Sequence, residues 1–387
     1  MPELNSKLPN IGTTIFTVMS ALAQEHGAIN LSQGFPDFPA PADLVDLVSR
    51  YMQEGFNQYP PMTGVPYLRE QVAAKIASLY GVSVDMDEEI TVTSGATESL
   101  YVAIQAVINP GDEAIVLDPA YDAYEPAISL AGGTTRHIPL QAPDFRPDWQ
   151  RLKDTLSSRT RLVIINSPHN PCGGVLSKND LDELAYAVRD SNAFILSDEV
   201  YEHMVFDGAQ HISVLSHPEL RRRAFAVFSF GKTYHATGWK VAYCIAPPTL
   251  TAEFRKIHQF VTFTTHTPTQ WALAEYLETH AAHYLELPAF YQRKRDLFVS
   301  EMGSSGFRMT PSQGTYFQLA DYSGLSNMPD VEFARYLTTD IGVAAIPISV
   351  FCAEPPAGKF VRFCFCKDDD TLREAAARLH QLEPVGD

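Results

Sequence analysis

Two lysines lie close together in the stretch SFGKTYHATGWK, residues 229–240, which contains no acidic residue. The apolar run AFAVF precedes this stretch and is typical of a buried strand, so Lys232 and Lys240 follow the end of a core element. Desolvation in a dry cleft lowers the pKa of a lysine amine and exposes its lone pair. Lys232 is therefore a candidate nucleophile, and Lys240 is a candidate partner for an anion.

Polar side chains also follow the other predicted core strands. They are Thr97, Tyr121, Asn170, Asp198 and Tyr201. Each has an ordinary explanation when taken alone, such as a turn, a helix cap or packing. However, ligands of parallel sheets collect at the carboxyl ends of the strands. We therefore expect these five residues and Lys232 to converge on one cleft.

The elements that must position these residues alternate between strand and helix from about residue 40 to 285. The predicted strands lie within 89–95, 112–118, 133–140, 160–168, 193–199 and 224–230, and helices are predicted within 96–108 and 177–191. The strands are continuous apolar runs, which is typical of a sheet covered by helices on both faces. This pattern predicts an α/β fold with a doubly wound, mainly parallel sheet, to which residues 239–247 add an antiparallel strand.

A smaller α+β domain is predicted after residue 285. Its helices are expected within 287–303, 330–342 and 368–382, and its strands within 314–322, 343–349 and 359–366. The domain boundaries are then 1–39 for an N-terminal arm that belongs with the small domain, 40–285 for the large domain and 286–387 for the small one. The arm is expected to pack on the small domain or on a second subunit.

Composition narrows the class of protein. The 387 residues include 45% hydrophobic and 19% charged residues, as in an ordinary folded protein, and the net charge of −17 argues against nucleic-acid or anionic-membrane partners. The five cysteines form no CxxC pattern and suit a reducing compartment, so we expect no metal site. The N-terminus has no signal-type apolar stretch, and no run is long enough to span a membrane. We therefore expect a cytoplasmic protein.

A lysine of this kind most commonly forms a Schiff base with pyridoxal phosphate, and the sequence contains groups for each part of that cofactor. The ring nitrogen needs a buried carboxylate, the ring oxygen needs donors, the ring needs a stacking partner, and the phosphate needs a helix N-terminus with a hydroxyl and a cation. Asp198 is the candidate for the ring nitrogen, Asn170 and Tyr201 for the ring oxygen, and Tyr121 for the stacking partner. The candidates for the phosphate are Ala96, Thr97, Ser229 and Lys240. Lys232 would carry the cofactor.

The sequence resembles the fold-type I, class I/II aminotransferases from end to end. The resemblance rests on NLSQGFPDFPAP, NQYPPMTGVPYLRE, VTSGATESLY, GDEAIVLDPAYDAYEP, NSPHNPCGGV, ILSDEVYEHMVF, SFGKTYHATGWKVAYCIAP, GTYFQLADY and FVRFCFC. Within that family it is similar to the bacterial methionine aminotransferases and to the kynurenine and glutamine transaminases. The resemblance implies a homodimer that transfers the amino group of methionine or aromatic amino acids to a 2-oxo acid.

The resemblance also implies further residue roles. Lys232 is the base for the proton shift, and Asp198 pairs with the cofactor ring. Arg362 binds the substrate carboxylate beside Gly34 and Asn170, and Tyr59 reaches the phosphate of the other subunit. Lys240 stands where many relatives have arginine.

The substrate side chain is expected in a largely apolar pocket. The stretch FVTFTTHTPTQ lacks the second arginine of dicarboxylate-specific relatives, and an unpaired distal carboxylate would be costly to bury. Phe16, Tyr124 and His266 are candidates for the pocket walls, although Phe16 is equally explained by packing.

Three alternative functions are set against this one. A cysteine-conjugate C–S β-lyase would use the same scaffold, and only its products distinguish it. A non-catalytic regulator on this fold usually carries an N-terminal DNA-binding module, for which about 30 residues before LSQGFPDF leave no room. A nicotinamide-binding dehydrogenase is disfavoured because no GxGxxG follows the first strand.

Overall fold

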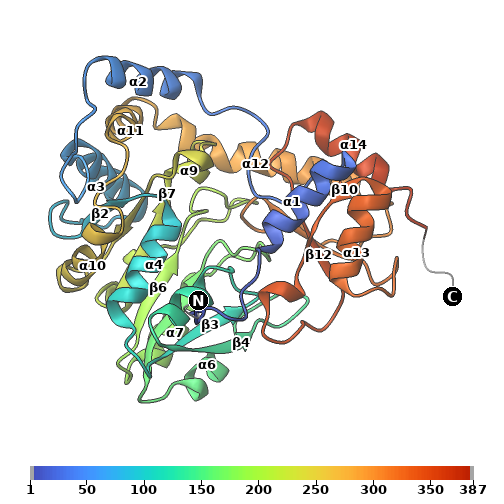
Figure 1. Cartoon of the computed structure of the whole chain (residues 1–387), viewed down its shortest axis with the longest axis horizontal. Helices are drawn as coiled ribbons and strands as arrows, with labels where there is room; N and C mark the ends of the chain where they lie inside the picture. The colour runs from blue at the N-terminus through green and yellow to red at the C-terminus, as the bar shows by residue number, and fades with distance from the viewer. Residues whose placement is uncertain (1–3, 384–387) are drawn as a thin grey trace.

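The structure, a computed structural model, describes residues 4–383. Its centre is a seven-stranded sheet (Figure 1) in the order β2-β8-β7-β6-β5-β3-β4. The strands are β2 (Ile90–Thr93), β3 (Glu113–Asp118), β4 (Thr134–Pro139), β5 (Thr160–Asn166), β6 (Phe194–Asp198), β7 (Ala224–Ser229) and β8 (Ala242–Ile245). All run in one direction except β8, which pairs antiparallel with both β2 and β7. The predicted doubly wound sheet and its antiparallel strand are confirmed.

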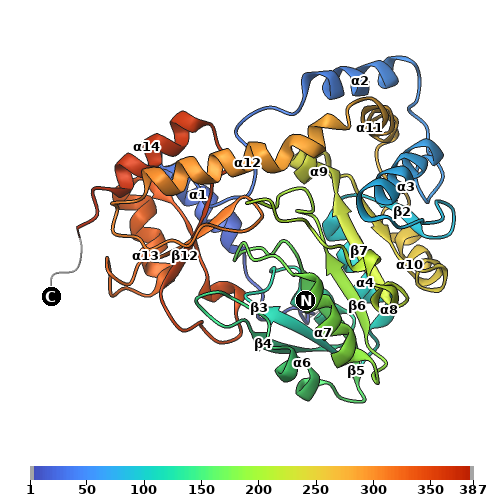
Figure 2. The ribbon, with the colours of Figure 1, turned by 180° about the vertical axis from the view of Figure 1, so that it is seen from behind.

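Helices cover both faces of this sheet. The helix α4 (Ala96–Val107) lies across one face and contacts β5 to β8 (Figure 1), whereas α6 (Trp149–Thr155) and α7 (Lys178–Val188) cover the other (Figure 2). Every residue of β3 is buried, as the unbroken apolar pattern of the strands predicted. The other helices of this part are α2 (Ala42–Gln53), α3 (Pro66–Tyr80), α5 (Tyr124–Leu130), α8 (Pro218–Arg221), α9 (Phe230–Thr233), α10 (Pro248–Val261) and α11 (Thr267–Thr279).

A second, smaller sheet of three antiparallel strands lies beside the first, in the order β11-β12-β9. It consists of β9 (Phe317–Asp321), β11 (Ile346–Pro347) and β12 (Phe360–Cys364). The helix α13 (Asp330–Tyr336) packs on β11 and β12, and α14 (Asp369–Leu379) follows β12 along the chain. The long helix α12 (Ala282–Glu301) runs from the region of α9 to α14, which it contacts (Figures 1 and 2). It begins five residues before the predicted start, because Pro288 lies inside the helix and does not open it.

The N-terminal stretch packs on the small-domain elements of the same chain. The helix α1 (Ile15–His26) contacts β10 (Val343–Ala344), and β1 (Ile29–Asn30) pairs parallel with that strand. This contact brings the segment around Gly34 to the space between the two sheets. The domain boundaries at residues 39 and 285 stay predictions.

Within residues 4–383, no helix combines the length and apolar character needed to cross a bilayer.

Candidate active site

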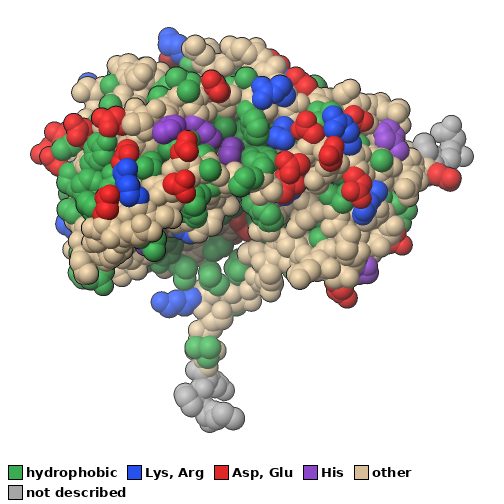
Figure 3. All heavy atoms as spheres, turned by 90° about the horizontal axis from the view of Figure 1, so that it is seen from above, with side chains coloured by type: hydrophobic (Ala, Val, Ile, Leu, Met, Phe, Trp, Pro, Cys, Tyr) green, Lys and Arg blue, Asp and Glu red, His purple; other side chains and the backbone are tan. Residues whose placement is uncertain are grey.

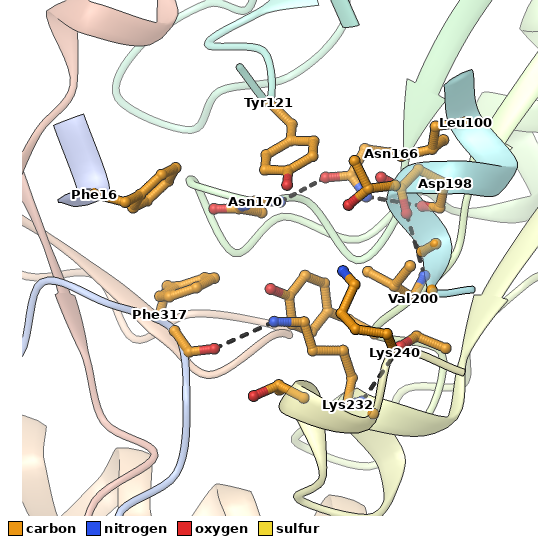
Figure 4. Close-up of a pocket in the computed structure, with 18 of the residues that line it drawn as sticks. Phe16, Leu100, Tyr121, Asn166, Asn170, Asp198, Val200, Lys232, Lys240 and Phe317 are labelled. Atoms are coloured by element: carbon orange, nitrogen blue, oxygen red, sulfur yellow. Dashed lines mark hydrogen bonds between the residues drawn. The ribbon is translucent and has the colours of Figure 1, made fainter. Parts of the chain in front are cut away.

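A cavity of about 230 Å³ lies between the carboxyl ends of the large sheet and the small-domain elements (Figure 4). It brings together twelve of the fifteen residues that the sequence singled out. They are Phe16, Gly34, Ala96, Thr97, Tyr121, Asn170, Asp198, Tyr201, Ser229, Lys232, Lys240 and Arg362. The convergence follows from the parallel topology, because α4, β6, α9 and the loops after β3 and β5 all begin or end at this edge of the sheet.

Lys232 points into the cavity from α9, which follows directly after β7 (Figure 4). Ser229 begins that short helix, and its hydroxyl accepts a hydrogen bond from the Lys232 backbone N–H. The amine donates to the Gly34 carbonyl at 3.2 Å and to the Tyr316 hydroxyl at 2.7 Å. Burial lowers the pKa of Lys232 to about 8. The amine therefore loses its proton about two pH units more readily than an ordinary lysine, and the neutral, nucleophilic form becomes the major one above about pH 8.

Asp198 ends β6 and is almost completely buried. Burial raises the pKa of its carboxyl to about 6, while a hydrogen bond from Tyr124 and the backbone N–H of Val200 act in the opposite direction. A buried carboxylate of this kind is stabilised further by a cationic ligand group placed against it. Asp198 is thus suited to face a protonated ring nitrogen.

An anion cradle lies at the N-terminus of α4. The first-turn N–H groups of Ala96 and Thr97 have no carbonyl within the helix to bond. The Lys240 side chain lies against Gly95, the residue before α4. A Cβ atom at Gly95 would lie 2.8 Å from the lysine Cε and 3.0 Å from its Nζ. Gly95 also has a φ of 86°, which favours glycine. With the Ser229 hydroxyl, which also lines the cavity, these groups supply the cation, the hydroxyl and the helix N-terminus that a phosphate needs.

Arg362, on β12, is fully buried on the opposite side of the cavity. Its Nη1 donates to Asn170 Oδ1 at 2.8 Å and its Nη2 to the Ser32 carbonyl at 2.7 Å, whereas its Nε has no partner. The guanidinium lies 3.8 Å from the centre of the Phe317 ring and 5.3 Å from that of Phe16. An unpartnered donor on a buried guanidinium favours a carboxylate ligand at this position.

Three predicted site residues do not line the cavity. Tyr124 is buried, but its hydroxyl bonds to Asp198 Oδ2 at 2.7 Å, so it lies behind the carboxylate and not in a wall of the substrate pocket. His266 is exposed, with its Nδ1 at 2.7 Å from Thr269 Oγ1. Tyr59 is 85% exposed. The last two lie on the outer surface of this chain.

Three residues that the sequence reading missed belong to the site. Asn166 donates from its side chain to the Asp198 carbonyl and accepts from the Asn170 N–H, which ties the ends of β5 and β6 together. Its position as the polar residue that ends the apolar run LVIIN was an available signal. Tyr316 contacts Lys232, and Phe317 lies against Arg362, but neither follows a core strand of the large sheet.

The residues of the cavity fit pyridoxal phosphate. The Lys232 amine matches the cofactor aldehyde, and the buried Asp198 carboxylate matches the ring nitrogen. The cradle, which stays open because Gly95 has no Cβ, matches the phosphate. In the described chain, no group of three or more His, Cys, Asp or Glu side chains is arranged to hold a metal ion.

Comparison with known proteins agrees with this geometry. Residues 26–379 match the family described as aminotransferase class I and II. The chain is 55% identical to methionine aminotransferase of Escherichia coli over 97% of its own length and 98% of that protein's. It is 33% identical to human kynurenine–oxoglutarate transaminase 1 over 93% of each chain. The crystal structure of YbdL from Escherichia coli, for which a methionine aminotransferase function was identified, superposes with a TM-score of 0.97 at 54% identity, covering 99% of this chain and 100% of that one. The chain belongs to the class I and II aminotransferases, enzymes that use pyridoxal phosphate.

Proposed function

We propose that this aminotransferase prefers methionine and aromatic or other apolar L-amino acids as amino donors. The observation that carries the proposal is that Arg362, set between the rings of Phe16 and Phe317, is the single arginine lining the cavity within residues 4–383. One guanidinium binds one carboxylate, so a second, distal carboxylate would be buried without a charged partner. The 55% identity to a methionine aminotransferase supports the same preference.

The cofactor would be held by residues of the large sheet. Lys232 would bond to its aldehyde, Asp198 would face the ring nitrogen, and Asn170 and Tyr201 would donate to the ring oxygen. Tyr121 would cover the ring. Ala96, Thr97, Ser229 and Lys240 would bind the phosphate. The bound cofactor supplies an aldehyde and a ring that draws electrons from the α-carbon of the amino acid.

The protein's own groups then have distinct tasks. Arg362 binds the α-carboxylate through two parallel, charge-assisted hydrogen bonds and so orients the Cα–H bond. Lys232 Nζ takes the α-proton and returns it, a step that depends on geometry and on an amine pKa near the working pH. Asp198 balances the positive charge of the ring nitrogen. The amino group passes first to the enzyme and then to a 2-oxo acid, in a ping-pong order.

We also propose a homodimer whose second chain completes the phosphate site through Tyr59. Tyr59 packs edge-on against Phe263, and Phe260 is 86% exposed on the same segment, so this surface is apolar and uncovered in one chain. Thr267 bonds to the Gln58 carbonyl, which places His266 on that surface as well. Figure 3 shows that the described residues ahead of α1, beginning with Leu4 at 96% exposure, stand away from the body of their own chain.

We assign the enzyme to the cytoplasm because all five of its cysteines are free thiols. We also retain residues 40–285 as the large domain and the remaining residues as the small one. The two sheets, which enclose the cavity between them, support this division.

The proposed preference is tested by a matrix of donors and acceptors on purified protein. Methionine, phenylalanine and kynurenine are expected to exceed glutamate and aspartate in kcat/KM, with parallel lines in double-reciprocal plots. A preference for dicarboxylate donors would contradict the proposal. Pyruvate and ammonia released from a cysteine conjugate without consumption of a 2-oxo acid would indicate a β-lyase instead. A sedimentation experiment on the same protein tests the dimer.

A further inference from the structure

Tyr316 makes a contact with Lys232 that the assigned roles do not explain. The tyrosine is completely buried and lies just before β9, far in sequence from Lys232. Its hydroxyl donates to the Gly34 carbonyl at 2.6 Å, and the Lys232 amine donates to the Tyr316 hydroxyl at 2.7 Å and to the same carbonyl at 3.2 Å. Two acceptors thus contact one amine. They are the Tyr316 hydroxyl, from the residue before β9, and the Gly34 carbonyl, from the N-terminal stretch.

The direction of these hydrogen bonds determines what Tyr316 can do. Because its only proton is committed to Gly34, the tyrosine oxygen presents a lone pair to the amine and acts as an acceptor. A neutral amine has two N–H groups and one lone pair. When both N–H groups are donated to Tyr316 and Gly34, the lone pair is directed away from them, toward the cavity that Lys232 enters in Figure 4.

The backbone next to Tyr316 supports the idea of a specified position. Thr315 has a φ of 66°, which is rare for a β-branched residue. Its backbone N–H bonds to the Met204 carbonyl, and its hydroxyl accepts from the Phe317 N–H, so this conformation is fixed from two sides. Strained conformations persist where the surroundings impose them, often at functional sites. Here the next residue along the chain is Tyr316, whose hydroxyl contacts Lys232.

We propose that Tyr316, with the Gly34 carbonyl, holds the free Lys232 amine in place for the proton shift and is therefore a positioning residue for the base. The proposal rests on the proposed function, since it concerns the stage at which Lys232 is not bonded to the cofactor. Tyr316 does not itself exchange the proton. It limits the positions of the amine and fixes the direction of the lone pair that accepts the α-proton.

The test is Tyr316→Phe, which keeps the ring and its edge contacts with Tyr201 and Phe317 and removes the hydroxyl. Tyr291→Phe is the matched control. Tyr291 is equally buried and its ring lies 5.7 Å from that of Tyr316, but its hydroxyl is paired with His235 Nδ1 at 3.0 Å. Loss of packing would affect both variants alike, whereas loss of the amine's acceptor affects only the first.

Two measurements decide the matter. In the first, apoprotein captures pyridoxal phosphate at a series of pH values, and the midpoint reports deprotonation of Lys232. Tyr316→Phe is expected to lower that midpoint by about half to one pH unit, because the ammonium loses an acceptor. In the second, a single turnover with the best donor is expected to slow about 10- to 100-fold in Tyr316→Phe, with KM unchanged and a larger α-deuterium isotope effect.

Wild-type behaviour of Tyr316→Phe in both measurements, or equal losses in Tyr316→Phe and Tyr291→Phe, would overturn the proposal. The capture experiment requires the cofactor but no amino donor, so it does not depend on transaminase activity. If the wild-type protein transaminates no donor, the proposed function fails, and the pH midpoint alone then decides whether Tyr316 holds the amine.

Discussion

The Tyr124 hydroxyl lies 2.7 Å from Asp198 Oδ2, so the first residue of α5 supports the carboxylate at the end of β6. This hydrogen bond lowers the pKa of Asp198, against the larger effect of burial, which raises it to about 6. The ionised state of the carboxylate therefore depends on a residue outside the cavity.

Removing the Tyr124 hydroxyl tests this support. In Tyr124→Phe the carboxylate loses a donor, its pKa rises, and its charge is lost at a higher pH as the solution is acidified. We expect the acid limb of the kcat/KM profile to move up by about half to one pH unit. Tyr186→Phe, which changes a half-exposed tyrosine on α7, is the control. A changed donor preference with an unmoved acid limb would instead return Tyr124 to the wall of the substrate pocket.

Lys232 is expected to be the residue that bonds to the cofactor. Borohydride reduction followed by peptide mass mapping should find a phosphopyridoxyl group on the peptide that contains Lys232, and Lys232→Ala should lose both the adduct and the visible absorbance. Lys240→Ala should retain the adduct. An adduct on Lys240 in the wild-type protein would reverse the two assignments.

Arg362 is expected to determine substrate affinity. Truncating one partner of a buried charged pair is costly, so Arg362→Ala should raise the KM for methionine by about 100-fold. Arg362→Lys keeps the charge but loses the planar fork and should recover only part of the affinity. The dissociation constant for pyridoxal phosphate should change much less than the KM, because Arg362 acts on the proposed cofactor site only through its hydrogen bond to Asn170. An unaltered KM would assign the carboxylate to another group.

Gly95 and Lys240 are expected to act as one unit in cofactor retention. A Cβ at position 95 would displace the lysine side chain, so Gly95→Ala and Lys240→Ala should each weaken cofactor binding by about 10- to 100-fold. Because both changes remove the same interaction, the double variant should be little worse than either single one. Equilibrium dialysis measures all three constants. Additive losses would show that Gly95 acts independently of Lys240.

Breaking a buried ion pair away from the cavity is expected to destabilise the fold. Lys75 donates to Glu202, which lies next to Tyr201 and also accepts from Tyr80, and both charged side chains are almost fully buried. Lys75→Met leaves Glu202 as an unpaired buried charge and should cost about 3–5 kcal/mol in urea unfolding. The double variant Lys75→Met, Glu202→Leu should recover much of that loss. Equal destabilisation of the single and double variants would show that the loss does not come from the unpaired charge of Glu202.

The large sheet could be predicted because its strands are unbroken apolar runs and its polar residues follow those strands. The antiparallel β8 was also predictable, since the short segment before it leaves no room for a crossover helix. The start of α12 was not, because Pro288 reads as a helix beginning although the helix is already under way. The error is local and leaves the site unaffected.

The candidate site, like the fold, contains residues that could be predicted from the sequence and residues that could not. Lys232, Asp198 and Asn170 could be found because parallel strands bring their carboxyl ends together. Tyr124 was misplaced because sequence does not show which side of the short helix α5 faces the sheet. Tyr316 was missed because its role depends on a contact across 84 residues, made by the residue that precedes β9 of the other sheet.

The two lysines at residues 232 and 240 sit on one segment fastened at both ends, by β7 before it and the antiparallel β8 after it. Both lysines that we propose to hold the cofactor thus belong to the framework of the large sheet. Arg362 and Phe317, which we propose to meet the incoming amino acid, belong to the smaller sheet. We therefore expect substitutions on the smaller sheet to change which amino acids the enzyme accepts without changing how tightly it binds the cofactor.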